Sequence, residues 1–192
     1  EMGIDFLVRL GVKMVWIGVE SKFNTHAKTQ NIDMKKLISE LQNHGITVNS
    51  SAILFLDHHT EKTIQDDIDW VVSLGADMTQ FMNYTAYPET ALYHRLNKEG
   101  KIKNMPYEKQ TGQIELNWEH PHIKDPKKHF SILKEAFQKK YERGGPAILN
   151  MTITAIKGYM KAKNDYKERL QRNLRWDHQT LSYIPSKVGE SP

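Results

Sequence analysis

Three glycines at near-regular spacing constrain the fold of this chain more than any other feature. Gly11, Gly45 and Gly75 lie 34 and 30 residues apart, and each follows a helix-like stretch and precedes a strand-like one. A glycine directly after a helix suits a left-handed C-terminal cap, because it has no Cβ to clash there. Helix, glycine and strand repeating about every 30 residues is typical of right-handed β-α-β units. The sequence therefore predicts an α/β fold of parallel strands.

Hydrophobic periodicity places the elements of this fold. Strands are expected at about 13–19, 47–56 and 78–84, and two later helices at about 126–142 and 147–162. Asp33 and Thr60 stand where N-terminal helix caps belong. We expect β/α repeats over residues 1–100, an irregular linker over 101–125 and a helical extension over 126–192.

Composition excludes several classes of protein. Of the 192 residues 39% are apolar and 26% charged, and no apolar run approaches the roughly 20 residues that a membrane span needs. The start of the chain does not read as a signal peptide, so a cytoplasmic location is expected. The absence of cysteine excludes disulfides, a thiol nucleophile and an iron–sulfur cluster held by this chain's own thiolates. A net charge of +4, scattered along the sequence, does not favour a nucleic-acid or membrane partner.

Each expected strand ends in polar residues. The first runs into Glu20 and Ser21, the second into Asp57-His58-His59, and the third into Asn83. In parallel α/β folds, ligand chemistry gathers at the carboxyl ends of the strands. These termini are the candidate functional positions.

The order of motifs resembles the second half of a radical S-adenosylmethionine (SAM) enzyme domain, of the kind that often follows a cobalamin-binding domain. The matching pieces, over roughly residues 1–160, are "WIGVES", "GITVNSSAILFLDHHTEKTIQDDIDWVVSLGAD", "QFMNYTAYPETALYHRLNKEGKI", "NWEHP" and "GPAILNMTITAIKGY". The resemblance implies half of a partial (β/α)6 barrel, its fourth to sixth strands, followed by a helical C-terminal extension.

The resemblance also implies a chemistry. The parent enzyme would be an oxidoreductase or methyltransferase that uses SAM, a [4Fe-4S] cluster and, in some members, cobalamin. The family's cysteine-rich cluster loop is absent from this sequence. The chain alone is therefore expected to bind none of these cofactors and to be inactive, as a fragment or a degenerate relative kept for binding or assembly. Its start inside a helix-like stretch favours the fragment.

The resemblance also points to individual cofactor-binding residues in this sequence. Glu20 and Ser21 fall where the family's fourth strand offers polar contacts to the SAM ribose. Ser51, on the next strand, and Gln80, on the third, are the other cofactor-binding candidates. The family usually has glycine where Phe55 and Glu89 stand in this sequence, and these two substitutions favour the degenerate relative. No metal ligand and no catalytic residue is assigned.

Other features have simpler interpretations. "DHH" at 57–59 could instead mark a small metal-dependent phosphoesterase, since Asp and His are suitable ligands for divalent metals. "DDID" at 66–69 is expected on a solvated helix face, "HPH" at 120–122 in a surface loop, and Trp16 in the core.

Three strands cannot close a barrel. We therefore expect the exposed sheet edge to be covered by the remaining half of the parent barrel, by a second copy of the chain, or by the C-terminal helices.

Overall fold

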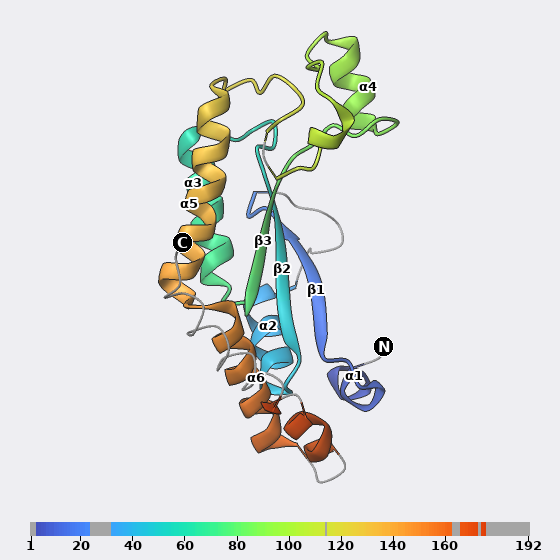
Figure 1. The fold of residues 1–192 in the computed structure, drawn as a ribbon, viewed down its shortest axis with the longest axis vertical. Helices are drawn as coiled ribbons and strands as arrows, with labels where there is room; N and C mark the ends of the chain where they lie inside the picture. The colour runs from blue at the N-terminus through green and yellow to red at the C-terminus, as the bar shows by residue number, and fades with distance from the viewer. Residues whose placement is uncertain (1–2, 24–31, 114, 163–165, 173, 176–192) are drawn as a thin grey trace, which may run out of the picture.

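The fold is α/β, with three parallel strands in one sheet and a helical C-terminal part (Figure 1). The computed structural model describes residues 3–23, 32–113, 115–162, 166–172 and 174–175. The elements in chain order are α1 (Ile4–Leu10), β1 (Met14–Glu20), α2 (Met34–Asn43), β2 (Thr47–Leu54), α3 (Glu61–Ser73), β3 (Met78–Asn83), α4 (Ala91–Lys98), the 3-10 helix η1 (Tyr107–Lys109), α5 (Pro126–Gly144) and α6 (Ala147–Lys161).

Local signals in the sequence account for the alternation of helix and strand. Asp33 caps α2 by accepting a hydrogen bond from Lys36 N at 3.0 Å. Thr60 begins α3 with a reciprocal capping box to Thr63. Gly45 and Gly75 adopt φ of 76° and 73° after α2 and α3, the left-handed conformation predicted for them. The expected strands and the two expected later helices are confirmed, although β2 ends at Leu54, two residues earlier than predicted. The part of the expected helical extension that follows residue 175 lies outside the described residues.

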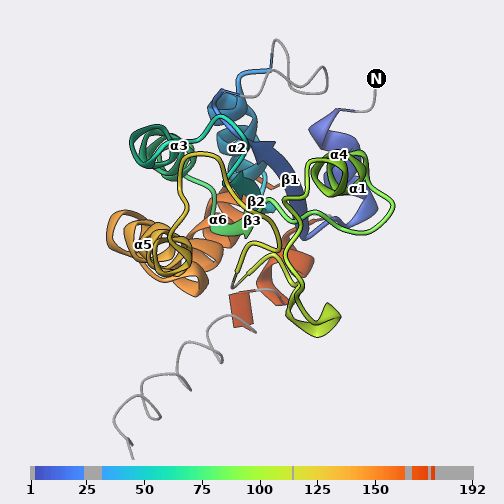
Figure 2. The same ribbon diagram turned by 90° about the horizontal axis from the view of Figure 1, so that it is seen from above.

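The sheet has the order β1-β2-β3, and helices cover one of its faces (Figure 2). Helices α2, α3 and α6 pack on β2, while α5 packs on β3. The side chains of β2 that point to these helices, Val48, Ala52 and Leu54, are fully buried. This helix-covered face is the main core, as a parallel sheet requires.

The core is continuous across all three predicted segments of the chain. Leu116 and Trp118 of the irregular segment and Leu133 of α5 belong to the same apolar cluster as Leu54 and Phe81 of the sheet. Within residues 3–162, the irregular segment and α5 therefore share one core with the β/α repeats.

Three helices hold the turn between α3 and β3. Gln42 of α2, Lys140 of α5 and Asn150 of α6 donate side-chain hydrogen bonds to the consecutive carbonyls of residues 75, 76 and 77, at 2.9, 2.7 and 3.4 Å. Burial lowers the pKa of Lys140, and the neighbouring Asp77 carboxylate partly offsets this effect. These bonds join the helical extension to the base of the sheet.

The contact between α2 and α6 depends on two glycines. Gly158 of α6 lies against the backbone of Gly45, and a Cβ added to Gly158 would come within 2.6 Å of Gly45 N and 3.0 Å of His44 C. Only glycine allows this approach. No helix within the described ranges is long and apolar enough to cross a bilayer.

Candidate functional site

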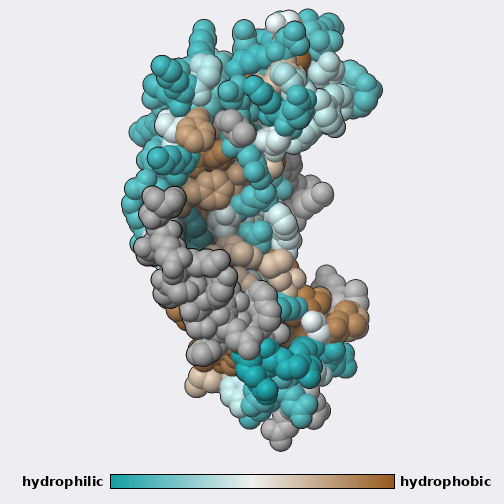
Figure 3. Space-filling model, viewed as in Figure 1, coloured by the Kyte–Doolittle hydropathy of each residue, from teal (hydrophilic) through white to brown (hydrophobic). Residues whose placement is uncertain are grey.

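The face of the sheet away from the helices carries most of the predicted site residues. We call it the open face. Its residues are Trp16, Gly18, Asn49, Ser51, Ile53, Met78, Gln80 and Met82. These residues are exposed or half-buried, whereas the alternate positions of β2 are buried under helices. The space-filling view shows a crescent-shaped molecule rather than a closed globule (Figure 3).

Strand register brings predicted residues from all three strands into one row. Gly18 of β1 pairs with Ser51 of β2, and Ser51 pairs with Gln80 of β3. The carboxylate of Glu20 folds back over Gly18, so close that a Cβ on that glycine would collide with Glu20 Oε1. Glu20, Ser51 and Gln80 therefore form a polar row across the open face.

The row has unused hydrogen-bonding capacity. Among the described residues, neither the Ser51 hydroxyl nor the Gln80 amide has a hydrogen-bond partner, and Asn49 Oδ1 is buried without one. Buried polar atoms in native proteins are usually satisfied by protein, water or ligand. The open face thus offers the Glu20 carboxylate, the Ser51 alcohol and the Gln80 amide beside the apolar side chains of Trp16 and Met78.

Ser21 does not belong to this row. It is 3% exposed, and its Oγ accepts a hydrogen bond from Phe23 N at 3.1 Å in the loop after β1. The bend of the chain at Glu20, where φ is 57°, ends the strand alternation before Ser21. Its hydroxyl therefore supports the loop.

Left-handed backbone at three non-glycine residues marks the carboxyl ends of the strands. Glu20 ends β1, Phe55 follows β2 directly and Glu89 lies in the loop after β3, with φ of 57°, 63° and 64°. These are the only non-glycine residues with positive φ in the described chain. A non-glycine residue in this conformation costs on the order of 1–3 kcal/mol, and such strain clusters at functional sites.

The "DHH" triplet does not form a metal site in the described structure. Asp57 binds Arg95 at 2.6 Å, His58 is exposed with its ring against Phe23, and His59 is fully buried. No group of three or more potential ligands comes together anywhere in the described ranges. The rings of His58 and His59 lie edge to face with centroids 4.7 Å apart, while Asp57 pairs with Arg95 and His59 with Asp67. The geometry therefore does not favour the phosphoesterase alternative.

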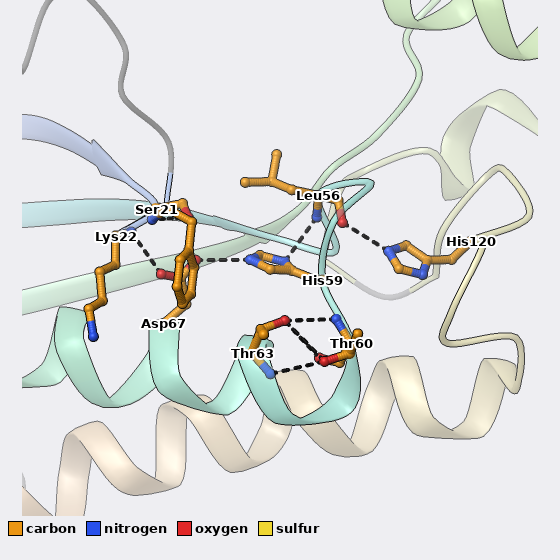
Figure 4. Close-up of polar contacts among 9 residues, drawn as sticks. Ser21, Lys22, Leu56, His59, Thr60, Thr63, Asp67 and His120 are labelled. Carbon is orange, nitrogen blue, oxygen red and sulfur yellow. Dashed lines mark hydrogen bonds and ion pairs between the residues drawn. The ribbon is translucent and has the colours of Figure 1, made fainter.

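His59 and Asp67 form a buried pair that joins three elements (Figure 4). His59 Nδ1 accepts a hydrogen bond from Leu56 N at 3.0 Å, so Nε2 carries the proton and donates to Asp67 Oδ2 at 2.9 Å. Asp67 Oδ1 accepts from Lys22 N at 2.7 Å. The pair therefore ties the loop after β2 to α3 and to the end of β1.

The burial of Asp67 corrects the expectation that "DDID" forms a solvated helix face. Asp67 is 1% exposed, because it shares the inward face of α3 with Ile64 and Ile68, three residues before and one after it. That spacing was visible in the sequence and was the signal that could have identified this residue. The buried partner, His59, could not be recognised in the same way.

Two further expectations need correction. Trp16 is 58% exposed, because it faces the open side of an edge strand rather than the helices. His120 of the "HPH" loop is 2% exposed. It accepts hydrogen bonds from the backbone N–H groups of His122 and Ile123 through Nδ1 and donates from Nε2 to Leu56 O at 3.0 Å.

The buried imidazole of His120 predicts a loss of stability in mild acid. Burial lowers its pKa from 6.5 to about 4, while the bond to Leu56 acts in the opposite direction. The unfolded chain therefore binds a proton that the folded chain does not accept between about pH 6.5 and 4, so stability falls as pH falls through this window. We expect His120 to contribute about 2–3 kcal/mol of loss between pH 7 and 4.5.

Urea unfolding of the wild type and His120→Asn at both pH values measures this contribution. The variant retains an acceptor near the Nδ1 position but cannot titrate, so its stability should depend less steeply on pH. His122→Asn, in the exposed residue two positions later, is the control. Parallel pH dependences of wild type and His120→Asn would contradict the assignment.

Comparison with known proteins does not assign the chain to a family. It matches no protein-family model, and no curated protein is similar enough to count as a relative.

Proposed function

We propose that the open face is one wall of a binding site for a small polar ligand, with SAM as the first candidate, in a half-barrel related to radical SAM enzymes. The observation that carries this proposal is the polar row of Glu20, Ser51 and Gln80, which comes from three strands through the register of the sheet. Three of the four residues that the resemblance assigns to the cofactor lie in this row.

The chemistry of the row suits such a ligand. A carboxylate, an alcohol and a side-chain amide can bind hydroxyl and amino groups of a ribose or an amino acid. Trp16, Met78 and Met82 border the row and offer apolar contact to a ring system. Sites for small ligands commonly combine a few polar groups with apolar walls in this way.

The backbone also supports the proposal. Phe55 and Glu89 occupy the two positions where the resembled family usually has glycine, and both have positive φ. Glycine is the residue that adopts this conformation most readily. The unusual backbone therefore coincides with the positions at which the resemblance predicts it.

The chain by itself does not fit an iron–sulfur cluster. It contains no cysteine, and the described residues bring no three potential metal ligands together. Radical chemistry, whether oxidation or methyl transfer, would require thiolates from another segment or chain, and no catalytic step is assigned to the residues present. Cobalamin would likewise be bound elsewhere. This chain's part in the proposal is to bind and orient.

A nuclear magnetic resonance titration with SAM tests the proposal. We expect amide shifts centred on residues 18, 20, 51 and 80 only at millimolar SAM, because a single wall leaves most of the ligand in water. Binding this weak agrees with the expectation that the chain alone retains no cofactor. Replacing Gln80 by Leu should reduce the shifts, and Gln138→Leu, at an exposed position of α5, should not.

Two results would contradict the proposal. Shifts that avoid the polar row, or that are unchanged in Gln80→Leu, would remove the assignment of the site. Micromolar binding would show that this chain is not merely one wall.

A further inference from the structure

The irregular segment before α5 builds a cavity that is separate from the open face. Residues 101–103 and 117–119 form a short antiparallel pair around the bridge between Ile102 and Trp118. Lys103 N donates to Asn117 O and Glu119 N donates to Lys101 O, both at 2.9 Å. Because side chains alternate along a strand, Lys101 and Lys103 lie on one side of this pair.

A third lysine completes the cavity. Lys124, in the loop that leads to α5, joins Lys101 and Lys103 around a volume of about 390 Å³. The other lining residues are Glu119, His120, Pro121 and Pro126. We call this cavity the lysine pocket. Three lysines and one glutamate line it, so the lining carries an excess of positive charge.

The lysine donors are largely unused. Lys103 Nζ has one long hydrogen bond, to Leu116 O at 3.3 Å, and Lys124 has no partner among the described residues. Lys101 Nζ binds Glu99 at 2.6 Å, but both side chains are more than a third exposed, and such pairs are weak and exchange readily. Each ammonium has three N–H donors, so most of them are available to a ligand.

The neighbouring groups add no free donor to the pocket. Pro126, the first residue of α5, lines the pocket but has no N–H, and the carboxylate of Asp125 caps the helix by accepting from Lys127 N at 2.9 Å. The Nε2 proton of His120 is engaged by Leu56 O. The attraction for an anion therefore rests on the three lysines. The segment that supplies the lining residues follows β3 and lies beyond the carboxyl ends of the strands, where parallel sheets place ligands (Figure 1).

We propose that the lysine pocket binds a phosphate group, either as free phosphate or as the phosphate of a small ester. Lysine acts as a point charge toward phosphate oxygens, and three ammonium groups match a dianion. The volume exceeds that of a phosphate ion, so the site has room for part of an attached molecule. This inference does not depend on the function proposed for the open face.

Calorimetric titration of the purified chain with inorganic phosphate and with glycerol 3-phosphate, at constant ionic strength, tests the proposal. We expect saturable binding of at least one of the two. Tighter binding of the ester would identify a phosphorylated metabolite as the ligand class, and tighter binding of phosphate would identify the free anion.

Matched triple variants separate a site from general charge attraction. Lys101→Gln, Lys103→Gln and Lys124→Gln together should weaken binding by about tenfold or more, because charged hydrogen bonds are lost. The control triple, Lys35→Gln, Lys62→Gln and Lys134→Gln, changes the net charge equally at exposed positions elsewhere. The proposal is overturned if neither ligand saturates, or if both triple variants weaken binding equally.

Discussion

Replacing Gly158 by Ala should destabilise the fold by about 2 kcal/mol or more, although alanine is the better helix former. In an exposed helix interior the same change would stabilise by about 1 kcal/mol. Here the new Cβ would meet the backbone of His44 and Gly45, which cannot rotate aside as a side chain can. Overpacking of a close contact typically costs 1–3 kcal/mol, and helix α6 must move away from α2 to relieve it.

Thermal and urea unfolding of Gly158→Ala and of Lys157→Ala measure this effect. Lys157 is the exposed neighbour in the same helix, so its variant reports on α6 without adding a Cβ against Gly45. An unchanged or raised stability of Gly158→Ala would show that the two helices are not in close contact.

The second large effect is expected for Asp67→Asn, with a loss of about 3 kcal/mol. Asp67 accepts two hydrogen bonds, from His59 Nε2 and from Lys22 N. An asparagine in the same place has one acceptor and one donor group, so a donor would face a donor. The other tautomer of His59 would not remove the conflict. In the wild type His59 Nδ1 accepts a hydrogen bond from Leu56 N, and a proton on Nδ1 would leave Leu56 N without an acceptor. A buried donor without a partner costs about 1–3 kcal/mol, and the cost is higher when the acceptor it has lost was a charged carboxylate.

Asp66→Asn is the matched control, because Asp66 lies one residue earlier on the exposed side of α3. Chemical unfolding at pH 7 should leave this control within about 0.5 kcal/mol of the wild type, as is usual for surface substitutions. Equal stability of the two variants would show that the buried pair does not support the fold.

Much of the fold could be predicted because its signals are local. Asp33 and Thr60 begin their helices, and Gly45 and Gly75 follow theirs, through contacts within a few residues. The lysine pocket gave no such signal, because Lys101 and Lys124 are separated by an irregular segment. Hydrophobic periodicity says which positions share a face, but it does not say which face the rest of the chain will cover.

The candidate site also combines features that the sequence predicts with features that only the fold decides. Alternation along β1 placed Trp16, Gly18 and Glu20 on one side, yet the sequence could not tell whether that side was inner or outer. The structure leaves Trp16 exposed and aligns Gly18 with Ser51 and Gln80 through the register of three strands. Register depends on the packing of whole strands against α2, α3, α5 and α6, so the sequence of a single segment does not determine it.

The sequence by itself determined the helix and strand alternation, the caps and the polar strand ends, since each depends on residues within about one helical turn or one strand. Only the tertiary structure decided that Asp67 is buried against His59, a residue of another loop. It also decided that Gly158 packs against the backbone of Gly45, and that Ser21 points away from the polar row to which Glu20 belongs. These outcomes depend on contacts between residues far apart in the chain, and such contacts form only when the helices close on one face of the sheet.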